Sequence, residues 1–508
     1  MMGTQMTAQA MPGAGAPRAP ELTWDTIDWP HANSNVRRLQ VRIAKAYREG
    51  KHGKVKSLQW ILTHSFCAKL LAVKRVTENK GAKTPGVDHI TWRTPKQKMA
   101  AALSLKRRSY KAQPLRRIYI PKKQKGKLRP LSIPVMQCRG QQALHLLALE
   151  PITETVADKN SYGFRPFRST ADAHARCHMT LSKGNSAQFI FEGDIKACFD
   201  TISHQWLIDH TPMDKTMLKK WLSAGYLENG ELFKTDFGTP QGGIISPALL
   251  IATLNGLENA VKSAVSKRGD KVNVCSYADD FIITGATKEV LVNKVIPVVE
   301  TFLKERGLEL SKEKTKITHI NEGFDFLGVN MRKYNGKLII KPAKDNVKRF
   351  LDNIRETVKS NRATKTENLI RLLNPKIIGW ANFHRHICAK RTFESVSHYL
   401  FGTLWRWAKR RHPNKGKKWI RHKYFRTKSK QHWIFSTKIK DSKGKASYLD
   451  LVEIGRTPIR RHIKIRAEAT PYDPAHQEYF VKRKKLREDK KLFRPCKTSW
   501  SAWWELES

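Results

Sequence analysis

Two adjacent carboxylates, Asp279 and Asp280, are the most chemically suggestive residues of the sequence. They stand in the stretch KVNVCSYADDFIITG, between a run of alternating apolar residues and the apolar run 281–283. Flanking runs of this kind predict a β-hairpin with the two acids at its tip. Adjacent acids repel each other beside an apolar sheet, so a divalent cation with oxygen ligands, such as Mg²⁺, is the simplest explanation. An acidic hairpin turn without a metal is the alternative, because Asp is common in turns.

The charge of the chain indicates a polyanionic partner. Lys and Arg number 96 against 44 Asp and Glu over 508 residues, which gives a formal net charge of +52. The basic residues are distributed along the whole chain, so a disordered basic tail does not explain them, and nucleic acid in a long channel is the expected partner. We expect no membrane association, since no apolar run approaches the roughly 18 residues needed to cross a bilayer.

The seven cysteines are scattered and never form a C-x-x-C pair, which favours a reducing compartment and argues against a zinc ribbon. The first 20 residues are rich in Ala, Gly and Pro and lack both acids and an apolar signal-peptide core. We expect a disordered lead-in over 1–21. An organelle transit peptide is the less favoured alternative.

Two basic segments precede the acidic motif and could contact nucleic acid. Residues 35–77 predict helices whose apolar positions leave Arg37, Arg38 and Arg42 on the other faces, where they contact RNA or template or simply face solvent. Residues 116–134, RRIYIPKKQKGKLRPLSIP, predict a hairpin with a basic tip that includes Lys122 and Arg129. Such a tip can bind a triphosphate. An ordinary exposed loop with the same basic residues is the alternative.

A third basic segment, SYGFRPFRSTADA at 161–173, places Arg165 and Arg168 beside a predicted helix start. Backbone N–H groups at a helix N-terminus favour phosphate, so we expect Arg165 to contact nucleic acid.

A further acid, Asp194, ends the predicted buried strand 189–191 in FIFEGDIKACFDTIS, with Phe199 shortly after it. Asp at a strand end is often only a turn former. Asp194 nevertheless lies far enough before Asp279 for its strand to return beside the acidic hairpin. Between them stands the glycine-rich turn FGTPQGGIISP, in which Gln241 offers a donor and an acceptor near a backbone that a ligand can approach closely.

The C-terminal third predicts helices and then a basic region with little strand signal from 433 to 491. Leu400, Leu404 and Trp407 keep the spacing of a helix core, which leaves basic residues on the opposite face: Arg406, Arg410 and Arg411. The tryptophans of this region are more often core than base-stacking platforms. The final stripe of Trp500, Trp503 and Trp504 is expected to dock on its own protein.

Read together, these motifs resemble the reverse transcriptases encoded by bacterial and organellar group II introns. The resemblance rests on SYGFRP, FEGDIKACFD, TPQGGIISP, YADDF and FDFLGV in this order, preceded by KTPGVD and RPLSIP. The later NPKIIGWANFHRH, WRWAKRRHP and KKWIRHKYF resemble the thumb and maturase domain. The resemblance spans about residues 22–485. The sequence departs from the family pattern at three positions: His89 and Phe167 stand where glycine is usual, and Cys138 stands where Asp is usual.

The resemblance implies a multidomain α/β right-hand polymerase with fingers and palm, an α-helical thumb/maturase domain and a basic C-terminal DNA-binding region. The expected boundaries are 22–92 for a basic helical N-terminal extension, 93–335 for fingers and palm, 336–429 for the thumb/maturase domain, and 430–508 for the DNA-binding region and tail.

The resemblance also implies roles for individual residues. Asp194, Asp279 and Asp280 are the catalytic carboxylates, and Asp194, Asp279 and the backbone carbonyl of Ile195 hold two Mg²⁺ ions, with Mn²⁺ as a substitute. The incoming nucleotide is contacted by Lys122, Arg129, Phe199, Gln241 and Lys314. Phe199 would exclude a ribose 2′-hydroxyl, and the alternative is that it is a core aromatic.

The function implied is that of an RNA-directed DNA polymerase that binds its group II intron RNA, assists splicing, and copies the intron into DNA by target-primed reverse transcription. The expected partners are the intron RNA, target DNA and dNTPs within a ribonucleoprotein; no oligomeric state follows. We expect the protein to be in the bacterial cytoplasm, associated with the nucleoid. An organellar location is the less favoured alternative. A splicing-only maturase and a reverse transcriptase co-opted for host defence are the alternatives. Because the cysteine pairs of an HNH nuclease are missing, priming is expected to use an existing 3′ end.

Overall fold

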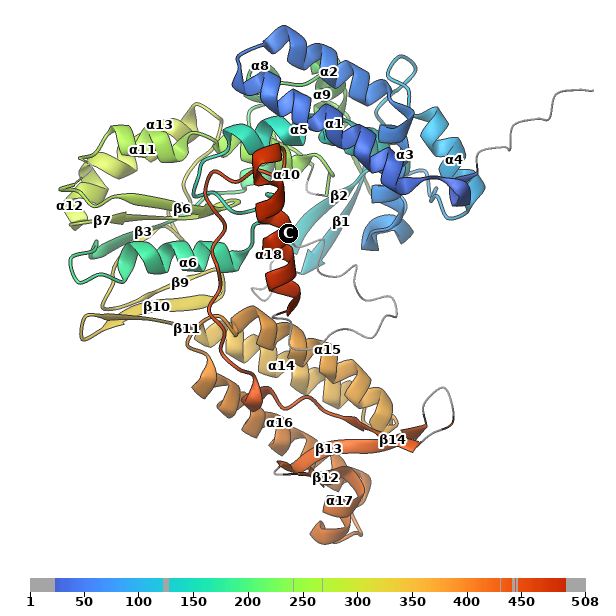
Figure 1. Ribbon diagram of the computed structural model, residues 1–508, viewed down its shortest axis with the longest axis vertical. Helices are drawn as coiled ribbons and strands as arrows, with labels where there is room; N and C mark the ends of the chain where they lie inside the picture. Colours follow the sequence, from blue (N-terminus) through green and yellow to red (C-terminus); the bar gives the residue numbers. More distant parts are fainter. Residues whose placement is uncertain are drawn as a thin grey trace, which may run out of the picture.

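The computed structural model describes residues 23–489, apart from 122–127, 241, 267, 430, 441–443 and 445. The expected lead-in and the tryptophan stripe of the tail therefore lie outside the described residues. Figure 1 shows an upper body, in which helices and sheets surround the acidic hairpin, and a lower arm of long helices.

The predicted N-terminal helices are present and form part of the upper body. α1 begins after Asp28, whose carboxylate accepts a hydrogen bond from His31 N at 2.9 Å, and Pro30 fits its first turn. The apolar faces pack into one core that includes Val36, Leu62 and Leu144. The helices concerned are α1 (Trp29–Arg48), α2 (His52–His64), α3 (Phe66–Thr77), α4 (Pro95–Ser104) and α5 (Met136–Val156).

The predicted basic hairpin forms the first two strands of a small sheet with the order β2-β1-β4-β5. β1 and β2 pair antiparallel, and β1 pairs parallel with β4. The strands are β1 (Leu115–Pro121), β2 (Leu128–Ile133), β4 (Tyr226–Glu228) and β5 (Glu231–Phe233). Three short helices, α7 (Cys198–Thr201), α8 (His204–His210) and α9 (Lys215–Leu222), precede β4 in the chain.

The second sheet of the upper body carries the acids. Its order is β6-β7-β3-β8, with every neighbouring pair antiparallel. Alternate residues face opposite sides, as strand geometry requires: Ile190 and Ile282 join the core on the α6 side, whereas Phe191 and Ile283 join the core that includes α10, α11 and α13. The strands are β3 (Phe189–Asp194), β6 (Asn273–Tyr277), β7 (Asp280–Gly285) and β8 (Lys316–His319).

Helices cover both faces of this four-stranded sheet. They are α6 (Thr170–Leu181), α10 (Ser246–Leu254), α11 (Leu257–Ser263), α12 (Lys288–Val290), a π-helical turn (Leu291–Val295) and α13 (Ile296–Lys304). A three-stranded sheet, β11-β10-β9, then leads toward the lower arm. Its strands are β9 (Phe324–Phe326), β10 (Val329–Tyr334) and β11 (Lys337–Pro342).

The lower arm consists of helices from Lys344 to Tyr424 and ends in a sheet. Its helices are α14 (Lys344–Ser360), α15 (Thr366–His384), α16 (Lys390–Arg411) and α17 (Lys417–Tyr424). The following strands pair in the order β12-β13-β14 and span Phe425–Lys428, Gln431–Lys440 and Ala446–Asp450. The prediction of little strand after residue 433 is therefore wrong: β13 continues past that point and β14 follows it.

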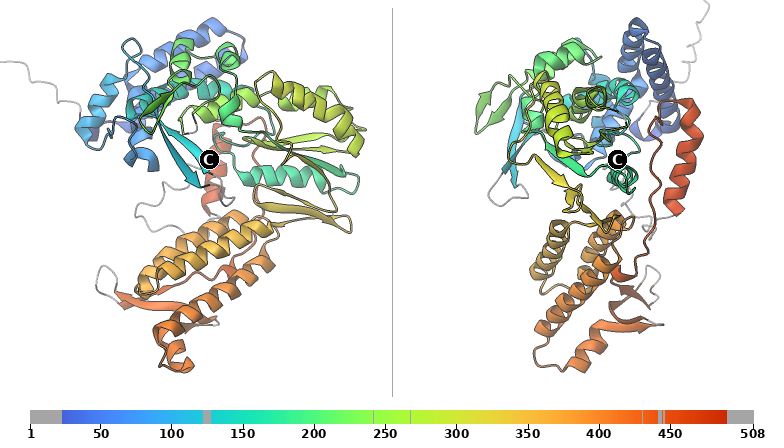
Figure 2. Two further views of the ribbon diagram at one scale, coloured as in Figure 1. Left: turned by 180° about the vertical axis from the view of Figure 1, so that it is seen from behind. Right: turned by 90° about the vertical axis from the view of Figure 1, so that its left-hand side faces the viewer.

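After this sheet the chain runs back over the upper body as a strap, which we define as residues 457–486. In Figures 1 and 2 this red segment passes from the lower arm along the upper body and ends in α18 (Gln477–Asp489). Ile465 and Ala469 are fully buried, and Tyr472 OH donates to Glu150 Oε2 of α5 at 2.8 Å. The strap thus ties the arm to the N-terminal helices, and it is not a free appendage.

Asp172 of α6 anchors the strap. Its side chain has no solvent exposure, and Oδ1 accepts hydrogen bonds from Ile465 N at 2.7 Å and from His462 Nε2 and Arg483 Nη2 at 2.9 Å each. Burial alone would raise the pKa of Asp172, but the hydrogen bond and charge of His462, the charge of Arg483 and the backbone bond hold it well below its ordinary value. The ionised carboxylate is therefore part of the fold.

No helix among the described residues is both long and apolar enough to cross a membrane.

We expect Asp172→Asn to lower the free energy of unfolding by about 3–5 kcal/mol, because it leaves buried Arg483 without its counter-charge. Glu367→Gln is the control: its partner Arg371 lies 2.9 Å away in an exposed pair, which contributes about 1 kcal/mol or less. Urea unfolding at neutral pH measures both. Because its folded pKa is depressed, the contribution of Asp172 is complete above the unfolded Asp pKa of about 3.9 and is lost as pH falls further. Equal losses in the two variants would contradict the anchor.

Candidate active site

The pairing of β3 with β7 brings the predicted carboxylates to the same end of the sheet. Asp194 ends β3 directly opposite Asp280, the first residue of β7. Asp279 stands in the turn between β6 and β7, next to Ala278, which adopts a left-handed backbone with φ of 58°. A non-glycine residue in that region is uncommon and is a feature of constrained turns. The strand of Asp194 thus returns beside the acidic hairpin, as the sequence predicted.

The SYGFRP segment holds this turn in place, a role that sequence analysis missed. Tyr162 N donates to Ser276 O at 2.9 Å, and Ser276 N donates to Asn160 O at 3.0 Å, so the segment extends the sheet along β6. A Cβ on Gly163 would lie only 2.2 Å from Ala278 N. Gly163 is therefore required for the segment to pack directly against the turn that carries Asp279.

A second glycine, Gly193 of β3, is also required for a close contact beside the acids. A Cβ on Gly193 would lie 2.2 Å from the ring of Phe281, the residue that follows Asp280. Any side chain there would displace Phe281 and with it the start of β7. Glycine next to an acid at a strand end is the sequence signal that could have identified this position.

The two carboxylates influence each other electrostatically. Burial raises the pKa of Asp279, and the nearby charge of Asp194 raises it further, whereas the charges of Arg129 and Lys314 lower it. Lys314 Nζ donates to Asp194 Oδ2 at 2.9 Å. Arg129 of β2 and Lys314 are thus both on the side of the sheet where the acids meet, as expected of residues that contact an anionic nucleotide.

The oxygen atoms at this end of the sheet suit a hard divalent cation. Asp194 O accepts from Ser311 N at 2.8 Å and Lys196 N donates to Glu309 O at 2.9 Å, so this bridge does not use the Ile195 carbonyl. Carboxylate and carbonyl oxygens are ligands that Mg²⁺ prefers. No three His, Cys, Asp or Glu side chains converge as a metal site within the described part of the chain. Asp194, Asp279 and the Ile195 carbonyl stay the predicted metal ligands, and Asp280 is exposed.

Phe199 lies on α7, half-buried, with its ring in an edge contact with Phe164 at 6.4 Å between centroids. It lines a cavity together with Pro240, and it also packs against the core of the sheet. Both predicted roles, sugar contact and core aromatic, remain predictions. Lys122 and Gln241 lie outside the described residues.

The structure separates the predicted nucleic-acid contacts into two groups. The side chains of Arg38 and Arg42 on α1, and of Arg406 and Arg410 on α16, are exposed. Arg37 is half-buried with its guanidinium 4.9 Å from the centre of the Tyr472 ring, and Arg411 donates to Arg362 O at 3.2 Å. Arg37 and Arg411 are therefore partly committed to contacts within the protein.

The prediction that Arg165 contacts nucleic acid is wrong, because its side chain is buried. Arg165 is 2% exposed, and its Nε and Nη2 donate to Glu154 at 2.7 and 3.0 Å. Arg168 is equally buried, pairs with the same carboxylate, and donates from Nη2 to Ala469 O of the strap at 3.1 Å. The three side chains form an internal ion cluster that joins α5 to the strap.

Two of the three positions where the sequence departs from the family pattern have the backbone that glycine would favour. His89 has φ of 55° and Phe167 has φ of 62°. For side chains with a Cβ this left-handed region is strained. The Phe167 ring packs 4.8 Å from that of Phe480 in α18, which helps to offset the strain.

Comparison with known proteins agrees with this geometry. Residues 24–105 match the family described as the N-terminal domain of reverse transcriptase, 120–331 match reverse transcriptase (RNA-dependent DNA polymerase), and 347–425 match the group II intron maturase-specific domain. Protein YkfC of Escherichia coli is 34% identical over 51% of this chain and 79% of its own. The group II intron-encoded protein LtrA of Lactococcus lactis is 31% identical over 52% of this chain and 54% of its own.

More distant matches have the same character. An uncharacterized 91 kDa protein in a cob intron of Schizosaccharomyces pombe is 29% identical over 45% of this chain and 35% of its own. The matched stretch thus spans about half the length of LtrA and less of the yeast protein. The chain belongs to the group II intron reverse transcriptases with a maturase domain, which are RNA-directed DNA polymerases with a fingers and palm fold.

If Phe199 selects the sugar by excluding a 2′-hydroxyl, Phe199→Val should raise ribonucleotide incorporation relative to dNTP incorporation by at least about tenfold, or ~1.4 kcal/mol. Single-nucleotide addition with each substrate measures the ratio. Phe237→Val is the control, because Phe237 lines the same cavity but is 63% exposed. If Phe199 is only a core residue, its truncation lowers stability by about 1–3 kcal/mol and depresses both substrates alike, which would overturn the sugar role.

Proposed function

We propose that this protein adds dNTPs to a DNA 3′ end on an RNA template at the Asp194–Asp279 site, within a ribonucleoprotein that contains its own intron RNA. The observation that carries the proposal is the β3–β7 register, which brings two acids together beside Lys314 and under the influence of Arg129. Two acids and two basic side chains at one strand end suit a reaction that moves a negatively charged phosphoryl group.

The oxygen set of Asp194, Asp279 and the Ile195 carbonyl would hold two Mg²⁺ ions. When bound, such ions lower the pKa of the attacking 3′-hydroxyl and stabilise the leaving pyrophosphate. Lys314, which pairs with Asp194 in this structure, would bind the phosphates of the incoming nucleotide. Arg129 of β2, whose charge also acts on Asp279, would contact the same phosphates.

Nucleic acid would lie across the exposed basic side chains of α1 and α16. Arg38 and Arg42 are on the upper body, and Arg406 and Arg410 are on the lower arm, in the part that matches the maturase-specific domain. This supports a role of α14–α16 as a thumb that holds RNA and assists splicing. Exposed basic residues of the strap, including Arg461 and Arg466, are where target DNA would bind.

Asp279→Asn should abolish primer extension and leave affinity for intron RNA within about twofold, because it removes a metal ligand and leaves the basic side chains that would contact RNA phosphates unchanged. The matched variant is Arg406→Ala with Arg410→Ala, which should weaken RNA binding and make it less salt-dependent while extension on a saturating template persists. Filter binding at several salt concentrations and primer extension measure both. A comparable loss of RNA affinity in Asp279→Asn would show that the two activities share one surface.

A further inference from the structure

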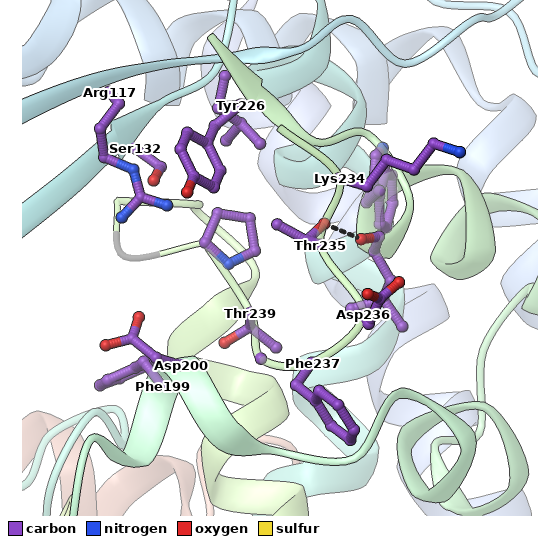
Figure 3. Close-up of a pocket in the computed structure, with 15 residues that line it drawn as sticks. Arg117, Ser132, Phe199, Asp200, Tyr226, Lys234, Thr235, Asp236, Phe237 and Thr239 are labelled. Carbon is purple, nitrogen blue, oxygen red and sulfur yellow. Dashed lines mark hydrogen bonds between the residues drawn. The ribbon is translucent and has the colours of Figure 1, made fainter. Parts of the chain in front are cut away.

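A cavity of about 310 Å³ lies beside the proposed site, and the proposed chemistry does not use it. Figure 3 shows its walls, which come from β1, β2, α7, α9, β4 and the segment 234–240. Phe199, the residue predicted to contact the sugar, forms part of one wall. The segment 234–240 leads directly to Gln241, which is also predicted to contact the incoming nucleotide. The cavity is therefore next to the place where template and nucleotide would meet.

The walls of the cavity are fixed by hydrogen bonds. Thr239 N donates to Phe199 O at 2.6 Å, and Gly238 N donates to Ile202 O at 2.8 Å. Gly238 has φ of 84°, and a Cβ there would lie 2.6 Å from Phe199 O. Glycine is thus required at this close approach, and the backbone contact it allows holds this wall of the cavity in place.

Two polar atoms of the lining residues are buried without a hydrogen-bond partner. They are Arg117 Nε and Thr239 Oγ1, and Thr239 is only 3% exposed. The guanidinium of Arg117 lies 3.7 Å from the centre of the Tyr226 ring, which in turn stacks on Phe233 at 5.2 Å. The stack of rings fixes the plane of the guanidinium, and Figure 3 shows its terminal nitrogen atoms directed into the cavity, where they could meet a polar ligand.

The charges around the cavity point to a neutral ligand. Arg117 and Lys234 are balanced by Asp200 and Asp236, unlike the strongly basic surface expected for phosphates. Figure 3 shows the Arg117 guanidinium and the Asp200 carboxylate facing each other on one side of the cavity. A flat, neutral group with both hydrogen-bond donors and acceptors, and of a size that fits the volume, is a nucleobase.

Among the bases, guanine matches this pair of side chains. Its O6 and N7 accept the two donors of an arginine fork, and its N1–H and amino group donate to a carboxylate. We propose that the cavity receives the unpaired template base immediately ahead of the templating position, with guanine as the preferred base. The proposal rests on the proposed function, because only a template-copying enzyme presents an unpaired base at this place.

The first test compares RNA templates that differ only in the base ahead of the templating position. Relative to guanine, 7-deazaguanine lacks the N7 acceptor, and hypoxanthine lacks the amino donor. Each should slow single-nucleotide addition about tenfold, the scale of one lost base contact. The readout is the ratio of the analogue rate to the guanine rate within one protein, so a uniform loss of activity in any variant cancels.

Two variants assign each contact to its side chain. In Arg117→Met the penalty for 7-deazaguanine should disappear while that for hypoxanthine remains, and in Asp200→Asn the reverse should hold. Equal rates on all three templates with the unmodified protein would overturn the proposal, as would penalties that persist in both variants.

A measurement without chemistry separates failure of the cavity from failure of the proposed function. With 2-aminopurine at the same template position and with neither metal nor dNTP present, binding of the protein should change the fluorescence, and Tyr226→Ala should reduce that change. If no template is extended at all, the polymerase function fails whatever the fluorescence shows. If templates are extended but the fluorescence is that of the free base, the cavity proposal alone fails.

Discussion

The repulsion between two carboxylates at one end of a strand pair is the constraint on which this structure depends. Asp194 and Asp279 approach closely enough that the charge of one raises the pKa of the other. The Lys314–Asp194 ion pair offsets part of this repulsion, and the pairing of β3 with β7 holds the two strand ends side by side. Gly163 packs against the turn before Asp279, and any side chain on it would force that turn outward. A cation relieves the same repulsion, which is why the arrangement suits a metal-dependent transfer of phosphoryl groups.

Buried ion clusters connect the upper body, the strap and the arm. The chain has a net charge of +52, and a few buried acids neutralise basic side chains where these parts meet. Glu154 binds Arg165 and Arg168, and Asp172 binds His462 and Arg483, so both link the upper body to the strap. The strap in turn contacts α5 through Tyr472. The arm that matches the maturase domain is therefore tied to the N-terminal helices by a segment that the sequence suggested was a separate DNA-binding appendage.

Sequence reasoning was most successful where a local pattern determines structure. The alternation around Asp279 predicted the hairpin, and the run before Asp194 predicted the strand that pairs with it. It failed where packing between separate elements decides. Arg165 lies in a motif that resembles a phosphate site, yet its side chain turns back to Glu154 of α5, and the pattern of the motif does not reveal that pairing. The close approach of Gly163 to Ala278 was hidden for the same reason, since it joins segments that are distant in the chain.

Metal-directed cleavage of the backbone is the most direct test of the central claim that Asp194 and Asp279 jointly hold the cation. When Fe²⁺ replaces Mg²⁺ and generates hydroxyl radicals, the protein should be cut beside both acids, in β3 and in the turn before β7. Excess Mg²⁺ should suppress both cuts, and Asp194→Asn should weaken the cut at the distant turn as well as the one beside the substitution. Cuts confined to other parts of the chain, or a cut at the turn that is unchanged in Asp194→Asn, would contradict the account.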